Sequence, residues 1–263
     1  MSPGANPAIA RPVCLITGAA TGIGAACARL FARQGWDIGV SYLDAETRLP
    51  AQGVAVECLT LGARAVLVEL DVTSTQSCVA AVASITQRFG QLDALVNCAG
   101  TTQFIAHADL DALPESEFAR TYDVNLVGTF RMIRACRDAL VASGRGAVVN
   151  ISSIAGTAGL GSSVAYAASK GAVNTLTLSM ARALAPHIRV NAIAPAYVSG
   201  GLPSRVLDGE RLAAVEQHYL ETQALKRLLD ADEVAALAHF LAASAPGITG
   251  EVIRMDNGLH LYA

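Results

Sequence analysis

The sequence predicts an α/β fold, in which one doubly wound, Rossmann-like domain carries a seven-stranded parallel sheet with helices on both faces. Short apolar runs and longer helical segments alternate along all 263 residues, as in proteins built from strand–helix–strand units. The hydrophobic fraction is 52% and the charged fraction only 16%, which suits a chain that is largely buried. No linker rich in Pro, Gly or Ser divides the sequence, so a single domain is expected.

Strands are expected where short apolar runs lack alternation, because this pattern is typical of strands buried on both faces. The first run, Val13 to Thr17, leads into a glycine-rich turn. The remaining predicted strands, in chain order, cover residues 37–42, 65–70, 92–97, 147–151, 188–193 and 251–255.

Helices are expected where apolar residues recur at intervals of three and four. In the first helix, residues 22–34, such a stripe runs from Ile23 to Phe31 and Gly35 ends it. Between the second and third strands, Pro50 and Gly53 predict a helix that starts late or breaks. The other predicted helices cover residues 74–89, 115–141, 163–185, 207–220 and 232–242.

The composition excludes several classes of partner and site. The net charge of −3 offers no basic field for a nucleic acid. The longest stretch without a charged residue or His, residues 146–169, contains Asn150 and many Ser and Gly, so no membrane span is expected. The six Cys form no CxxC pair and do not cluster with His. Neither a disulfide framework nor a metal site is therefore expected.

The first ten residues contain no positive segment followed by an apolar core, so they do not resemble a secretory signal. We expect residues 1–10 to be a disordered lead and residues 11–263 to form the folded domain. A reducing, cytoplasmic compartment is the corresponding prediction.

A glycine-rich turn joins the first strand to the first helix. Gly18 permits a tight turn, Gly22 allows close approach of a ligand, and Gly24 allows the helix to pack against the sheet. The helix N-terminus, with Thr21 and Ile23 beside these glycines, offers free N–H groups to a pyrophosphate. The alternative is a flexible turn without a ligand.

The next two strand ends could contact the same ligand. Asp71 closes the third strand and could accept a hydrogen bond from an adenine amino group, or it could cap the following helix. Asn97-Cys-Ala-Gly100 closes the fourth strand, where the glycine could let the backbone pass a ribose or adenine. A plain turn is the alternative there.

Tyr166 and Lys170 stand at positions i and i+4 of a predicted helix, so they share one face. An ammonium beside a phenol lowers the pKa of the phenol, which then serves as a proton donor and acceptor. The chain has 17 Arg but only two Lys, Lys170 and Lys226. A buried Tyr beside a surface-seeking Lys is the alternative. Ser152 and Ser153 end the fifth strand, and only one of them can face the same crevice.

Five motifs together resemble the short-chain dehydrogenase/reductase family in its compact form. The resemblance extends from about Arg11 to Gly258 and selects Ser153 over Ser152. The motifs, in order, are Thr17-Gly-x3-Gly-Ile-Gly24, Asn97-x-Ala-Gly100, Asn125, Ser153 and Tyr166-x3-Lys170.

The resemblance implies an NAD(P)-dependent oxidoreductase of class EC 1.1.1 that transfers a hydride between nicotinamide and a carbonyl or secondary alcohol. The small substrate would be of the 3-oxoacyl, sugar or polyol type. Tyr166 would be the acid/base, Lys170 would lower its pKa and bind the nicotinamide ribose, and Ser153 would hold the substrate oxygen. Asn125 would keep a helix bend open for a water. A non-catalytic dinucleotide-binding regulator on the same fold is the alternative.

The resemblance also implies the cofactor contacts and a substrate lid. Gly200 and Gly201 are expected to loosen the lid, at about residues 197–225. The predicted cofactor contacts are Gly18, Thr21, Gly22, Ile23, Gly24, Tyr42, Asp71, Val72, Asn97, Ala99, Gly100, Tyr166, Lys170, Pro195 and Val198.

The end of the second strand bears on the choice between NAD and NADP. An acid at Tyr42 would bind the ribose of NAD and repel a 2′-phosphate, but Tyr42 carries no charge. Asp44 could still reach a ribose, and Arg48 could reach a phosphate. NADP is favoured, and NAD stays open. A homotetramer is expected from the resemblance and from the apolar, Ala-rich helices at 115–141 and 163–185.

Overall fold

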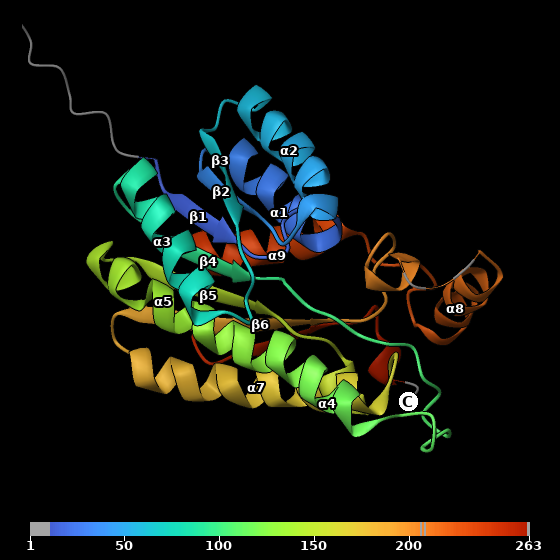
Figure 1. The fold of residues 1–263 in the computed structure, drawn as a ribbon. Helices are drawn as coiled ribbons and strands as arrows, with labels where there is room; N and C mark the ends of the chain where they lie inside the picture. The colour runs from blue at the N-terminus through green and yellow to red at the C-terminus, as the bar shows by residue number, and fades with distance from the viewer. Residues whose placement is uncertain (1–10, 206, 208, 262–263) are drawn as a thin grey trace, which may run out of the picture.

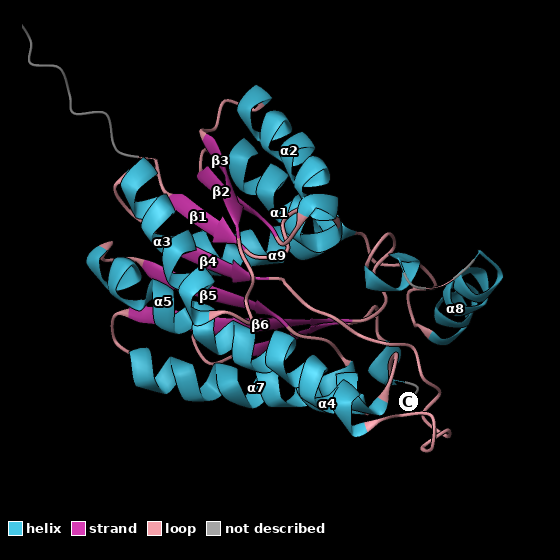
Figure 2. Cartoon of the chain, viewed as in Figure 1, coloured by secondary structure: helices cyan, strands magenta, loops and turns pink. Residues whose placement is uncertain are grey.

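The computed structural model describes residues 11–205, 207 and 209–261 (Figure 1). The lead predicted at residues 1–10 lies outside these residues. One parallel seven-stranded sheet runs through the molecule in the order β3-β2-β1-β4-β5-β6-β7 (Figure 2). Its strands are β1 Val13–Ile16, β2 Asp37–Tyr42, β3 Ala65–Glu69, β4 Ala94–Asn97, β5 Gly146–Ile151, β6 Ile188–Pro195 and β7 Val252–Met255. The strand order reverses between β1 and β4, where a doubly wound sheet opens a crevice at its carboxyl edge.

Helices cover both faces of the sheet (Figure 1), as the doubly wound prediction requires. Successive β1 residues pack on opposite sides: Cys14 and Ile16 belong to one apolar core, and Val13 and Leu15 to the other. One face is covered by α1 Gly22–Arg33, α2 Ala45–Thr60 and α9 Ala231–Ala243. The other is covered by α3 Thr75–Phe89, α4 Glu115–Tyr122, α5 Gly128–Ala142 and α7 Val164–Leu184.

The prediction of a late or broken helix after β2 is wrong, because α2 is continuous and contains Pro50. The buried stripe of this helix includes Ala51, Val54 and Cys58, whereas Pro50 and Gly53 are exposed. Proline removes one backbone hydrogen bond, but on this exposed face water can replace it. Asp44 also fixes the start of the helix through a capping box with Thr47.

The single helix predicted at residues 115–141 contains a π-helical segment, Asp123–Val127, between α4 and α5. Two short elements outside the predicted helices also border the site: α6 Ala155–Ala158 and the 3₁₀ turn Leu202–Arg205. Helix α8, Gly209–Thr222, projects from the body of the molecule (Figure 1). In the described part of the chain, no helix is long and apolar enough to span a bilayer, and no group of side chains could hold a metal ion.

Candidate active site

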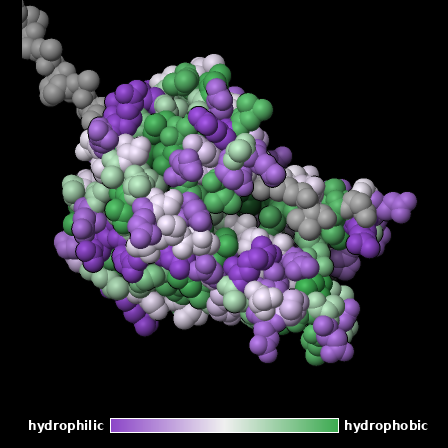
Figure 3. All heavy atoms as spheres, viewed as in Figure 1, coloured by the Kyte–Doolittle hydropathy of each residue, from purple (hydrophilic) through white to green (hydrophobic). Residues whose placement is uncertain are grey.

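A cavity of about 1070 Å³ opens at the carboxyl edge of the sheet. Figure 3 shows the surface hollowed beside the projecting α8, with hydrophobic side chains in the hollow. The predicted site residues that line it are Gly18, Thr21, Gly22, Ile23, Ala99, Gly100, Ser153, Tyr166, Lys170, Pro195 and Val198. Those that do not line it are Gly24, Tyr42, Asp71, Val72, Asn97 and Asn125.

The glycine turn is built for close backbone contact. Gly18 adopts a φ of +63°, and a Cβ there would stand 3.0 Å from the Cα of Ala99. A Cβ at Gly24 would overlap the Gly18 carbonyl. Thr17 ties the turn to the end of β4, because its Oγ1 accepts hydrogen bonds of 2.9 Å from the N–H groups of both Cys98 and Ala99. The turn is therefore held at one place beside the cavity.

The start of α1 fits the pyrophosphate of a dinucleotide. Thr21 is the N-cap, but its side chain makes no capping hydrogen bond. The backbone N–H groups of the first turn therefore stay free to donate to a ligand. The first turn contains no acidic residue that would repel an anion. Gly18, Thr21, Gly22 and Ile23 all line the cavity at this point.

Tyr166 and Lys170 project from α7 into the same cavity. Ser163 begins this helix, and its Oγ accepts a hydrogen bond of 3.2 Å from the N–H of Tyr166. The Lys170 ammonium lies 5.6 Å from the centre of the Tyr166 ring and donates a 2.8 Å hydrogen bond to the Ile151 carbonyl. The predicted one-sided pair is therefore present, and Lys170 is 6% exposed.

Burial shifts the pKa values of both groups toward their neutral forms. It raises the pKa of Tyr166 to about 12, although a hydrogen bond with Ser153 acts in the opposite direction. It lowers the pKa of Lys170 to about 8. The sequence predicted that Lys170 would lower the pKa of the phenol. In the protein alone burial is the largest influence on the pKa of the phenol, and the ammonium is directed at the Ile151 carbonyl.

The two serines at the end of β5 are used differently. The Ser152 hydroxyl donates to Asn174 Oδ1 at 2.6 Å and is 2% exposed, so it points away from the reacting groups. Ser153 lies close enough to Tyr166 to affect the pKa of the phenol, and its Oγ accepts from the Ala155 N–H at 3.1 Å. The structure thus places Ser153, rather than Ser152, beside the phenol.

Asn125 occupies the π-helical segment and is buried behind the cavity wall. Its Oδ1 accepts from the Thr101 N–H at 2.8 Å, and its Nδ2 donates to the Thr101 carbonyl at 3.1 Å and to Ser169 Oγ at 3.0 Å. Ser169 in turn donates to the Tyr166 carbonyl at 2.7 Å. Asn125 therefore joins the loop after β4 to the helix that carries Tyr166.

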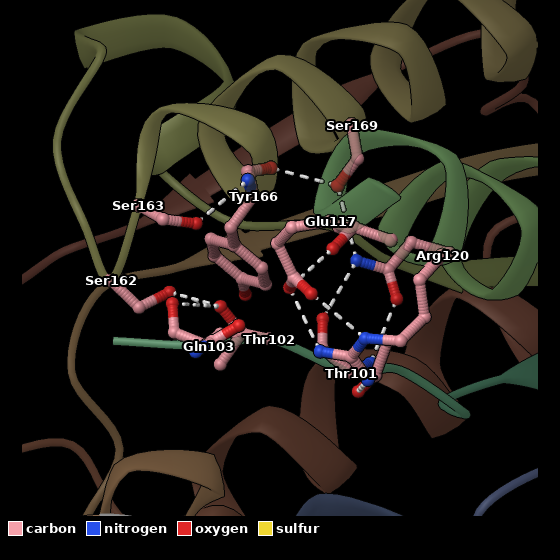
Figure 4. Close-up of polar contacts among 11 residues, drawn as sticks. Thr101, Thr102, Gln103, Glu117, Arg120, Ser162, Ser163, Tyr166 and Ser169 are labelled. Carbon is pink, nitrogen blue, oxygen red and sulfur yellow. Dashed lines mark hydrogen bonds and ion pairs between the residues drawn. The ribbon is translucent and has the colours of Figure 1, made fainter. Parts of the chain in front are cut away.

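An ion pair with a buried carboxylate and an exposed guanidinium, which the sequence reasoning missed, holds the same loop (Figure 4). Arg120 donates two hydrogen bonds of 2.8 Å to Glu117, which is 4% exposed, and a third of 2.6 Å to Thr101 Oγ1. The hydrogen bonds from Arg120 lower the pKa of Glu117. The Thr102 and Ser162 hydroxyls also share a hydrogen bond of 2.5 Å. The spacing of Glu117 and Arg120, i and i+3 on one helix face, is the only signal in the sequence.

Three other predicted cofactor contacts have side chains that are hydrogen-bonded elsewhere, and a fourth has a buried side chain. Asp71 Oδ1 accepts two hydrogen bonds from Thr73, which is its turn-capping role. Asn97 Nδ2 donates to Asn150 at 2.9 Å, and Val72 is 8% exposed. Tyr42 donates to Glu69 at 3.3 Å. The cofactor contacts of Asn97 and Val72 stay predictions.

The predicted lid surrounds the outer part of the cavity. The Tyr197 hydroxyl donates a 2.8 Å hydrogen bond to Glu216 of α8, and the Tyr197 and Tyr219 rings stack with centres 5.4 Å apart. No residue of α8 is buried. Two side chains therefore connect a largely exposed helix to the end of β6.

Comparisons with known proteins agree with this architecture. The family model described as enoyl-(acyl carrier protein) reductase matches residues 18–260. A solved short-chain dehydrogenase/reductase from Burkholderia xenovorans superposes with a TM-score of 0.90 at 47% identity, over 96% of this chain and 99% of that one.

Curated relatives of similar length act on different hydroxy compounds. Trans-4-hydroxycyclohexanecarboxylate dehydrogenase of Sinomonas cyclohexanicum is 36% identical, over 95% of this chain and 93% of its own length. Galactitol 2-dehydrogenase of Agrobacterium fabrum is 33% identical, over 94% of this chain and 96% of its own length.

Proposed function

The chain belongs to the short-chain dehydrogenase/reductase family, and on that premise we propose that it interconverts a ketone and a secondary alcohol with a nicotinamide cofactor. The observation that carries the proposal is the convergence of the glycine turn with Ser153, Tyr166 and Lys170 in one cavity. A non-catalytic dinucleotide-binding regulator is not favoured, because it has no use for a phenol, a hydroxyl and a buried ammonium beside the turn.

In the direction of reduction, the residues divide the work as follows. The bound nicotinamide supplies the hydride. Ser153 holds the carbonyl oxygen by a hydrogen bond, and the Tyr166 hydroxyl donates the proton to that oxygen. Lys170 donates one N–H to the Ile151 carbonyl. Its other two N–H groups would be available to the nicotinamide ribose, and its positive charge would stabilise the phenolate. Asn125 positions α7 through Ser169.

The proposal is tested by incubating the protein with reduced cofactor and a panel of ketones. The panel contains cyclohexanone, 4-oxocyclohexanecarboxylate and its methyl ester, a 3-oxoacyl thioester and keto sugars, because the relatives act on cyclic hydroxy acids and polyols. Stoichiometric formation of an alcohol is the expected result with at least one ketone. Cofactor binding without turnover of any ketone would favour the regulator instead.

We propose NADP as the preferred cofactor. No free carboxylate marks the end of β2: Asp44 accepts hydrogen bonds from Thr47 at the start of α2, and Tyr42 is a phenol. The Arg48 guanidinium lies 5.9 Å from the centre of the Tyr42 ring, so a cation stands beside the residue that we expect to face the adenosine ribose. The Glu69 carboxylate beside Tyr42 acts against the preference.

Tyr42→Asp is expected to shift the preference toward NAD, because it adds a ribose partner and a charge that repels the 2′-phosphate. The measurement is the ratio of kcat/KM for NADP to that for NAD. Tyr42→Phe is the matched control, since it keeps the ring beside Arg48 and adds no charge. An unchanged ratio in Tyr42→Asp would show that the choice is made elsewhere.

We also propose that the enzyme is a cytoplasmic homotetramer. Apolar residues stand exposed on the two long helices of one face, including Val141 on α5 and Leu178 on α7. Burying them between subunits is favourable. Light scattering is expected to give the mass of four chains, and a monomer at micromolar concentration would contradict this.

A further inference from the structure

Most polar side chains on the cavity wall are already paired within the protein. The hydroxyl of Ser152 donates to Asn174, that of Tyr197 to Glu216, and that of Thr222 to the His218 carbonyl. Ser162 is paired with Thr102, and Glu221 accepts from Gln217. Thr21, His218 and Tyr219 are the other polar side chains of the wall outside the catalytic group and Lys226, so a polyhydroxylated substrate would find only a few free partners for its many hydroxyls.

The remaining wall beyond the reacting groups is largely apolar. The apolar side chains that form this wall come from the loop after β4, the loop before α7, the lid and the C-terminal turn. They are Phe104, Leu160, Leu202, Pro203, Val215 and Leu259. Such a wall suits the hydrocarbon body of a substrate.

Lys226 contributes a positive charge to the same cavity. It and Lys170 are the two Lys of the chain, and of the Lys and Arg residues described by the structure they alone line the cavity. Lys226 is exposed, which places it at the mouth. Its Nζ donates a 2.5 Å hydrogen bond to the Glu221 carbonyl at the end of α8. Among the described side chains it has no carboxylate partner, so two N–H donors stay available.

The backbone around Lys226 is fixed in an uncommon conformation. Its φ is +49°, a value that residues with a side chain rarely adopt. The neighbouring residues are held by the segment after β7: the Leu225 N–H donates to the Asn257 carbonyl at 3.0 Å, and Asn257 Nδ2 donates to the Arg227 carbonyl at 2.8 Å. The ammonium is therefore presented from a rigid segment rather than from a loose loop.

We propose that the substrate is an apolar keto acid or the corresponding hydroxy acid, whose carboxylate binds Lys226 while its oxygen lies between Ser153 and Tyr166. The inference rests on the proposed function and adds the substrate class to it. The apolar walls hold the hydrocarbon body, and the lysine at the mouth pairs with the charge at its far end.

The test compares kcat/KM for 4-oxocyclohexanecarboxylate and for its neutral methyl ester, in the wild type and in Lys226→Met. The variant is expected to lose about tenfold or more with the acid, the lower range for a hydrogen bond between charged groups. With the ester it should change little. The preference of the wild type for the acid should also fall as salt is added.

Two further variants separate charge recognition from structure. Lys226→Arg is expected to restore much of the preference for the acid. Arg227→Met removes the adjacent cation, which is paired with Glu233, and should leave the ratio of acid to ester unchanged.

The outcomes are distinguishable from failure of the proposed function. Equal loss with both substrates, no loss with the acid, or preferential reduction of sugars would overturn the inference while the reductase activity stands. If the wild type reduces no ketone at all, the proposed function fails and the inference fails with it.

Discussion

Tyr166→Phe is expected to reduce turnover by ~10² to 10⁴-fold, the usual loss when general acid–base catalysis is removed. The variant keeps the ring and removes only the hydroxyl, which lies near Ser153 in the cavity. Ser153 can still hold the substrate oxygen, but it is not activated to deliver a proton.

Cofactor binding serves as the control for this variant. The turn from Gly18 to Gly24 is held by Thr17 and the end of β4, so it is untouched by a change at Tyr166. Fluorescence titration with reduced cofactor is expected to give the wild-type Kd. Turnover within a few-fold of the wild type would mean that another group moves the proton.

Lys170→Met is expected to lower turnover and weaken cofactor binding together, because one ammonium serves both the phenol and the ribose. Met fills a similar volume but cannot donate to the Ile151 carbonyl, and this bond is 2.8 Å in the protein. Lys170→Arg is not expected to restore full activity, because a planar guanidinium differs in reach and geometry. A rise in KM for the cofactor, beside a fall in kcat, is the measurable signature.

The same variant should change the pH dependence of alcohol oxidation. Oxidation needs the phenolate, so its rate should rise with pH as Tyr166 ionises. Phenolate and ammonium stabilise one another, so in the wild type they titrate as a pair. Without the cation, the transition should move to higher pH, because the charge that favours the phenolate is gone. Carbonyl reduction should fall with rising pH in the wild type, since it uses the protonated phenol. An unmoved transition would contradict the assigned pairing.

The parallel sheet and its helices were predictable because each element has a strong local pattern. Runs such as Val13 to Thr17 are apolar on both faces, and the stripe on α1 has helical spacing. The prediction of a broken helix at Pro50 was wrong, because it considered only the local effect of proline. The opposite face of α2 is buried against the core. The packing of Ala51, Val54 and Cys58 outweighs the lost hydrogen bond.

The residues that line the site were also predictable where a motif requires a particular residue type. Glycines at positions with positive φ and the i, i+4 pair of Tyr and Lys can be recognised from the sequence itself. The role of the Glu117–Arg120 pair is hard to predict from the sequence, because it depends on a contact with Thr101, which is distant in sequence. The pKa values likewise depend on burial, which the order of residues does not reveal.

The most direct test of the central claim follows the hydride itself. Wild type and Tyr166→Phe are each incubated with a ketone and with reduced cofactor deuterated at the transferable position, and the alcohol product is analysed. We expect deuterium on the carbinol carbon of the wild-type product, and product formed ~10² to 10⁴-fold more slowly by Tyr166→Phe. Cofactor consumption without deuterium on that carbon, or equal labelled product from both proteins at equal times, would contradict the account.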